Sequence, residues 1–185
     1  VTKVIFLGTI LMLVFKPLNL SISLNSEFKI PELSEKYRIQ RYSPYQVLSN
    51  ETLNLLQSLN CEVREVQLFS SDPMQKFQIH IDGHNINNGI GAVNLVINDN
   101  TKWEMEWFTR LDNTELDKLI SSGTTSYMKL NESECKFLSK HTSKDAFLVR
   151  VDIPHRIVNN DISPRHCISI RFINNNFERL NNILS

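Results

Sequence analysis

The chain has 185 residues, enough for one domain with a sizeable hydrophobic core. Its 20 basic and 20 acidic residues cancel, which argues against a surface built for nucleic acid or for a polyanionic substrate. The 3 cysteines, Cys61, Cys135 and Cys167, are odd in number and widely spaced, so they predict neither a disulfide framework nor a zinc site. We therefore expect reduced thiols and a cytoplasmic protein.

An apolar run from Val4 to Phe15 follows Lys3 near the start of the chain. It resembles the apolar region of a signal peptide, is short for a membrane span, and has no Ala-x-Ala-like cleavage site behind it. We interpret residues 1–27 as a leader whose status stays open between a signal or anchor, a buried N-terminal strand or helix, and a mistaken start. A signal or anchor would make the protein secreted or membrane-anchored. The compact domain is expected to span residues 28–185.

Strands are predicted where apolar and polar residues alternate, and helices where apolar residues recur at helical spacing. The expected strands are 37–42, 63–69, 77–82, 92–97, 102–108, 147–153 and 165–173. The expected helices are one capped by Asn50, short ones over 114–120 and 177–184, and a helical turn within 131–140, with a polar loop over 121–127. Hairpin-linked strands behind one helix predict a mainly β fold, a double-stranded β-helix (jelly-roll) core with a few flanking helices. A barrel of this kind can hold a small ligand in its mouth.

The strand over 77–82 has two unlike faces. Its apolar residues alternate with Gln78, His80 and Asp82, so His80 and Asp82 point to the same side. One further histidine on a neighbouring strand would complete a set of two imidazoles and one carboxylate. Such a set suits Fe(II), because it fills three coordination positions and leaves the others open. The loop from Gly83 to Gly91 directly follows this strand. Loops in such positions often border a functional site.

A second group of candidate residues lies near the C-terminus. His155 follows Pro154 at the end of one apolar strand, and Arg165 begins the next. By strand parity, Arg165 shares its face with Cys167, Ser169 and Arg171.

Residues 154–159 and 165–172 resemble the closing strands of Fe(II)/2-oxoglutarate-dependent oxygenases, in particular the prolyl- and aspartyl-hydroxylase-like branch. The resemblance covers roughly residues 60–173. It implies that His80, Asp82 and His155 bind iron, and that Arg165, ten positions after His155, binds the C5 carboxylate of 2-oxoglutarate. A guanidinium fork matches a carboxylate in this way. Some members have a serine two residues after that arginine; Cys167 stands there in this chain, so Ser169 is the substitute candidate.

The resemblance further implies a dioxygenase that uses O₂ and oxidatively decarboxylates 2-oxoglutarate to succinate and CO₂. The expected outcome is hydroxylation of an amino-acid side chain, protein-borne or free, or of another small molecule. Two alternatives stay open. A cupin-like metalloprotein would use the same three ligands without 2-oxoglutarate and would not need Arg165. A membrane-anchored, non-catalytic binding domain would carry the motif as a vestige.

Several other residues are rivals or neighbours of these candidates. His84 rivals the ligands but lies in a Gly/Asn loop, where a solvated side chain is expected. Arg171 rivals Arg165 but lies six residues deeper on the same strand face. His141 and His166 are expected at the surface, and Trp103 and Trp107 in the core. Asn94 either lines the pocket or is a satisfied core residue.

Overall fold

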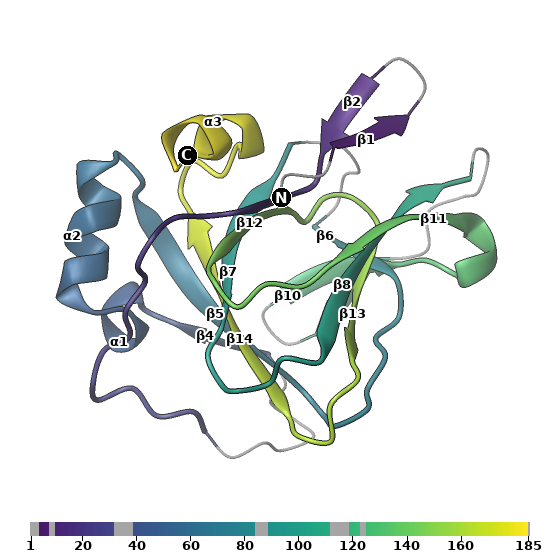
Figure 1. Ribbon diagram of the computed structural model, residues 1–185. Coiled ribbons are helices and arrows are strands. Elements are labelled where there is room, and N and C mark those ends of the chain that lie inside the picture. The colour runs from purple at the N-terminus through teal and green to yellow at the C-terminus, as the bar shows by residue number, and fades with distance from the viewer. Residues whose placement is uncertain are drawn as a thin grey trace.

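The computed structural model describes residues 4–7, 10–31, 39–83, 89–111, 119–122 and 125–184. For the strands within 4–12, and for 119–122 and 125–126, it describes the backbone alone. Two six-stranded antiparallel sheets dominate this part of the chain (Figure 1). The first sheet has the order β3–β12–β7–β14–β5–β4, and the second has the order β11–β8–β13–β6–β10–β9.

The first sheet comprises β3 (Phe15–Pro17), β4 (Ile39–Tyr42), β5 (Val63–Ser71), β7 (Gly91–Val96), β12 (Phe147–Arg150) and β14 (Arg165–Phe172). The second comprises β6 (His80–Asp82), β8 (Trp103–Arg110), β9 (Leu119–Ser122), β10 (Thr125–Lys129), β11 (Cys135–His141) and β13 (His155–Asn159). A separate hairpin joins β1 (Val4–Leu7) and β2 (Ile10–Leu13). The helical segments are α1 (Pro44–Val47), α2 (Asn50–Ser58), η1 (Glu132–Glu134) and α3 (Phe177–Ile183).

The strand order confirms the predicted jelly-roll core. From β5 onward the chain crosses repeatedly between the sheets, so that β5, β7, β12 and β14 are neighbours in the first sheet and β6, β8, β11 and β13 in the second. This interleaving of two antiparallel sheets is the arrangement of a double-sheet jelly roll. In such an arrangement a strand turns one face toward the opposite sheet and the other face outward.

The two faces of the first sheet differ in what they contact. One face packs against the helices through a cluster that includes Val66, Leu68, Val93, Ile168 and Ile170. The other face meets the second sheet, where Phe15, Ala92, Trp103, Trp107 and Phe147 form a second buried cluster. Trp103 and Trp107 are 1% and 0% exposed, as expected for core residues. The odd-numbered residues of β14 belong to this inner face, and they bring polar groups into the space between the sheets.

Several predicted elements differ from the structure. The helix predicted over 114–120 lies partly outside the described residues, and its end is strand β9. The loop predicted over 121–127 contains the end of β9 and the start of β10. The helical turn predicted within 131–140 corresponds to the short 3₁₀ segment η1, and the rest of that range is strand β11. β11 pairs with β8, and such distant pairing overrides local helical spacing.

Part of the predicted leader packs on the domain. β3 pairs with β12 at the edge of the first sheet, and Val14, Phe15 and Leu18 are at most 5% exposed. The backbone bonds Arg150 N to Val14 O (3.0 Å) and Leu18 N to Ala146 O (2.8 Å) continue the pairing on both sides of β3. No helix of the described residues has the length and apolar character to span a membrane. A division of the chain near residue 27 stays a prediction. A chain that lacks its first 27 residues would lose the contacts of β3 with β12 and the three buried side chains.

A chain that starts at Phe28 should be less stable and less soluble than one that starts at Leu13. The shorter chain loses three buried apolar side chains, each worth about 1.5–3 kcal/mol when fully buried, and exposes the edge of β12 to intermolecular pairing. Thermal unfolding and light scattering of the two chains measure the difference. Equal melting temperatures and solubilities would show that β3 is dispensable.

Candidate metal centre

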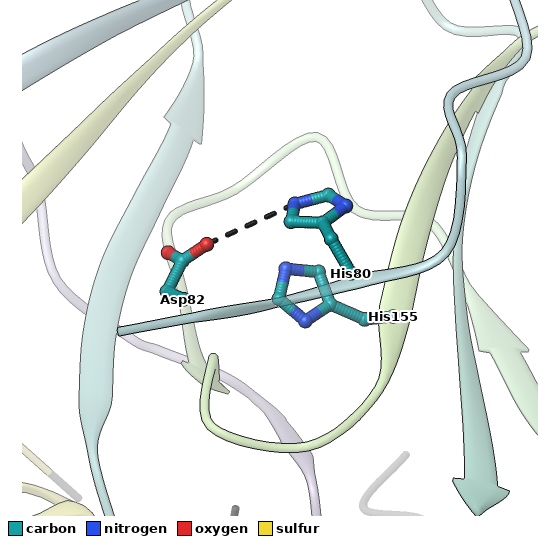
Figure 2. Close-up of side chains that lie close together, drawn as sticks. All are labelled: His80, Asp82 and His155. Atoms are coloured by element: carbon teal, nitrogen blue, oxygen red, sulfur yellow. Dashed lines mark ion pairs between the residues drawn. The ribbon is translucent and has the colours of Figure 1, made fainter. Parts of the chain in front are cut away.

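Two neighbouring strands of the second sheet supply the three predicted ligands. β6 carries His80 and Asp82, and His155 at the start of β13 lies directly opposite His80 in the antiparallel register. Residues opposite each other in such a pair share a face, with Cβ atoms about 4.5–5.5 Å apart. The two imidazole ring centroids are accordingly 4.5 Å apart. Figure 2 shows both rings and the Asp82 carboxylate close together.

Apolar residues on the opposite face fix this orientation of β6. Ile79 and Ile81 are 1% and 0% exposed and pack in a cluster with Phe108, Met128 and Leu130. A shift of one residue would expose both isoleucines and bury the polar face in their place. The alternation predicted from the sequence is therefore enforced by burial.

Each imidazole is oriented by a backbone carbonyl two residues earlier in the chain. His80 Nδ1 lies 2.9 Å from Gln78 O, and His155 Nδ1 lies 2.7 Å from Ile153 O. A neutral imidazole that donates through Nδ1 presents the lone pair of Nε2, which is the arrangement usual for a metal ligand. Burial, with a smaller contribution from His80, lowers the pKa of His155 to about 4, so its ring is neutral at pH 7.

Asp82 is held by an arginine from the other sheet. Arg171 of β14 donates from Nη2 to Asp82 Oδ2 at 2.7 Å, while Oδ1 faces His80 Nε2 at 3.8 Å. Burial alone would raise the pKa of the Asp82 carboxyl, but Arg171 and the two histidines together lower it below its ordinary value of 3.8. The carboxylate is therefore ionised and ready to bind a cation.

The three residues have the chemistry and nearly the spacing of a metal site. Their ligand atoms all lie within 4.8 Å of one another. Two ligands that lie about 2.1 Å from one ion and at right angles to each other are about 3.0 Å apart, so a pair at the upper limit would close by roughly 1.8 Å on binding. The side chains of His80 and Asp82 are 24% and 26% exposed, which leaves solvent access to the centre. Two nitrogens and one carboxylate oxygen suit Fe(II) and leave positions open for other ligands.

A second set of polar side chains lies on the inner face of the first sheet, whereas the three ligands belong to the second sheet. Arg165 is opposite Ser71 in the register of β14 and β5, and Ser169 is opposite Asn94 in the register of β14 and β7. All four residues are at most 9% exposed. Arg165 Nε and Nη2, Ser71 Oγ, Ser169 Oγ and Asn94 Oδ1 are buried without a hydrogen-bond partner in the described residues. We call Ser71, Asn94, Arg165 and Ser169 the buried polar patch.

Buried polar atoms of native proteins are nearly always paired, so this patch requires an explanation. The Arg165 guanidinium lies 4.4 Å from the centroid of the Trp103 ring, a cation–π contact that only partly replaces hydration. An anionic ligand would supply acceptors for the Arg165 donors and for the hydroxyls of Ser71 and Ser169. Arg165, Ser169 and Asn94 are candidates from the sequence, whereas Ser71 lies just beyond the strand predicted over 63–69 and was missed.

The structure differs from the sequence analysis in where it places the remaining histidines and Arg171. His141 and His166 are half-buried, not surface residues: the His141 ring stacks on Phe15, and His166 Nδ1 lies 2.9 Å from Ser70 Oγ. His84 lies outside the described residues. Cys167 Sγ contacts Ile168 O at 3.4 Å, and Ser169 supplies the one hydroxyl of β14. Arg171, weighed as a rival to Arg165, instead contacts Asp82.

A cavity of about 360 Å³ lies elsewhere, at the turn between β7 and β8. Its lining residues include Val96, Asn98, Thr101 and Lys144, and none of the three ligands. It opens on an exposed turn, and its charged lining residues are Asp99 and Lys144, with no histidine or cysteine among the lining residues. The donor chemistry therefore identifies the functional site better than the size of this cavity does.

No protein family profile and no curated protein sequence matches this chain. Similar solved structures include a mutant of Bacillus subtilis oxalate decarboxylase OxdC, with 10% identity, a TM-score of 0.38, and coverage of 80% of this chain and 29% of that one. Another is E. coli ycfD, with 10% identity, a TM-score of 0.38, and coverage of 71% of this chain and 31% of that one. This chain thus spans less than a third of either protein. A likeness at this level does not establish family, activity or ligand.

His80→Ala and Asp82→Ala should each lower Fe(II) affinity by more than about 100-fold, because loss of an outer partner of a ligand alone costs about 10–100-fold. Circular dichroism should show an unchanged fold. Anaerobic Fe(II) titration measures the affinity. His166→Ala, which removes a half-buried histidine from β14, is the matched control and should bind normally. Retention of tight binding in both ligand variants would contradict the assignment.

Proposed function

We propose that this chain is a mononuclear metalloprotein in which His80, Asp82 and His155 bind a divalent ion, with Fe(II) as the natural occupant. The observation that carries the proposal is the orientation of both histidines, whose Nδ1 atoms are tied to carbonyls and whose Nε2 atoms are left for the ion. Thiolate ligands, which would favour zinc or copper, are not among the three residues. Anaerobic loading should give one Fe(II) per chain, and metal content measured by elemental analysis tests this.

Within that class, we propose more specifically a 2-oxoglutarate-dependent oxygenase. Its support is the buried polar patch, above all the Arg165 guanidinium, which is 2% exposed and has unused donors. An unpaired buried charge costs several kcal/mol, so a protein keeps one where a ligand of opposite charge will meet it. Ser169 and Asn94 offer further hydrogen bonds on the same inner face. The metal supplies the oxidative chemistry; the chain's own residues bind and orient the cosubstrate and exclude water from it.

The position of Arg165 sets a demand on this ligand. Arg171, which reaches Asp82, lies six residues further along β14, so the two arginine Cα atoms are roughly 20 Å apart at about 3.3 Å per residue. A ligand bound at the metal must therefore be long enough for its far end to meet the Arg165 side chain, which extends from the buried polar patch. A dicarboxylate with one metal-chelating end and one free carboxylate meets this demand better than a compact anion does.

The cupin-like alternative shares the metal centre and lacks 2-oxoglutarate, and the three ligands support it equally. Only the buried polar patch separates the two, so binding of 2-oxoglutarate is the decisive property. The substrate would be an amino-acid side chain, protein-borne or free, or another small molecule, and the zero net charge gives no reason to expect nucleic acid. A non-catalytic binding domain with a vestigial motif would bind no metal. Release of succinate from labelled 2-oxoglutarate, across a panel of peptides and amino acids, tests for oxygenase activity.

Arg165→Ala should weaken 2-oxoglutarate binding by roughly two to four decades while Fe(II) still binds. Breaking a buried charge pair costs about 3–5 kcal/mol, and each 1.4 kcal/mol is about tenfold in affinity. Arg165→Lys should keep part of the affinity, because it preserves the charge and loses the fork. Titration of 2-oxoglutarate into the anaerobic Fe(II) protein, followed by the metal-to-ligand charge-transfer band, measures the effect.

Arg64→Ala is the matched control, since it removes the same charge from a side chain that is 54% exposed. It should bind 2-oxoglutarate as the unaltered chain does. If Arg165→Ala also binds normally, the carboxylate clamp is elsewhere. If the unaltered chain binds Fe(II) but gives no charge-transfer band with 2-oxoglutarate, the cupin-like alternative is favoured.

A further inference from the structure

Arg171 makes the ion pair that joins the candidate metal centre to the first sheet. Its side chain is 10% exposed and crosses from β14 to β6, where Nη2 lies 2.7 Å from Asp82 Oδ2. We infer that Arg171 keeps Asp82 a one-oxygen ligand, and that it thereby holds a coordination position open for an anionic ligand of the metal. Arg171 is then a positioning residue. The inference rests on the proposed metal centre and concerns how that centre is used.

The geometry of the contact is the first argument. An arginine–carboxylate pair that serves stability alone is frequently a fork, with two parallel hydrogen bonds to both carboxylate oxygens. Here the contact engages Oδ2, and Arg171 Nε is buried without a partner in the described part of the chain. Oδ1 is left on the side of the histidines, 3.8 Å from His80 Nε2. The carboxylate is thus divided between an arginine and the candidate metal position.

The choice of partner is the second argument. Glu65 lies directly opposite Arg171 in the register of β14 and β5, so the two side chains leave the sheet on the same face. Glu65 is instead bound by Arg41 at 3.3 Å and Arg64 at 3.1 Å, and it accepts a hydrogen bond from Gln67. Neutralising the nearest carboxylate on its own sheet is therefore not the role of Arg171. Its charge is directed across the interior to a predicted metal ligand.

Both consequences of this contact favour an anionic ligand at the metal. A carboxylate freed of Arg171 can chelate with both oxygens and take up one more coordination position. The guanidinium also adds a positive charge close to the ion, which strengthens its attraction for anions. Affinity for the metal itself is a poor readout, because repulsion between the guanidinium and the ion opposes the gain from a well-oriented ligand. Anion binding is the better readout, because both effects act on it in the same direction.

The test uses the full chain loaded with Co(II), whose visible spectrum reports coordination number, and azide as the anionic probe. Arg171→Met keeps an apolar stem of similar reach and removes the charge. It should weaken azide binding by about tenfold or more, within the range found for outer partners of metal ligands. Its Co(II) bands should also lose intensity as Asp82 adds its second oxygen. Arg171→Lys should recover part of the azide affinity.

Arg41→Ala is the matched control, because it removes a guanidinium from the same sheet and should leave spectrum and azide affinity unchanged. Wild-type azide affinity and an unaltered spectrum in a folded Arg171→Met chain would overturn the inference. A loss of succinate release from 2-oxoglutarate, with azide affinity and the Co(II) spectrum both unchanged, would overturn it as well. Arg171 would then act on the substrate. If Arg171→Met does not fold, the spectrum of Arg171→Lys decides by the same criterion. Failure of the unaltered chain to bind Co(II) would instead refute the proposed metal centre.

Discussion

The pairing of β6 with β13 is the constraint on which the candidate site depends. It sets His155 opposite His80, and strand alternation then places Asp82 on the same face. A slip of one residue would separate the histidines and turn the polar face of β6 away from the interior. Burial of Ile79 and Ile81 on the opposite face opposes such a slip, so the hydrophobic effect that stabilises the fold also fixes the ligand geometry.

The interior between the sheets contains both packed apolar side chains and buried polar side chains. Phe15, Trp103, Trp107 and Phe147 fill one part of it. The inner face of β14 fills another with two arginines, a serine and a cysteine, all at most 8% exposed. A core that served stability alone would avoid buried charges, because their desolvation is seldom repaid by pairing. Arg171 has an acidic partner in Asp82, and Arg165 has unused donors. Both observations are consistent with the proposed binding of a cation and an anion.

Strand parity predicted much of this arrangement from the sequence. The alternation within 77–82 and 165–172 correctly assigned which residues share a face, because a two-residue period leaves little freedom once one face is apolar. What parity cannot give is the placement of one sheet on the other. The contact from Arg171 to Asp82 joins residues 89 positions apart, and no local pattern indicates it. The same limit explains β11, a strand that pairs with β8 and that the sequence analysis did not predict behind the helical turn. It also explains β3, where an apolar run with the appearance of a leader packs onto β12.

The proposed function depends on a single iron ion held by His80, Asp82 and His155. Anomalous diffraction at the iron absorption edge, from crystals grown anaerobically with Fe(II), tests it most directly. The account predicts one strong peak bounded by Nε2 of both histidines and Oδ1 of Asp82, with Asp82 Oδ2 still on Arg171. A peak at another position, or iron-loaded crystals with no peak between these three residues, would contradict it.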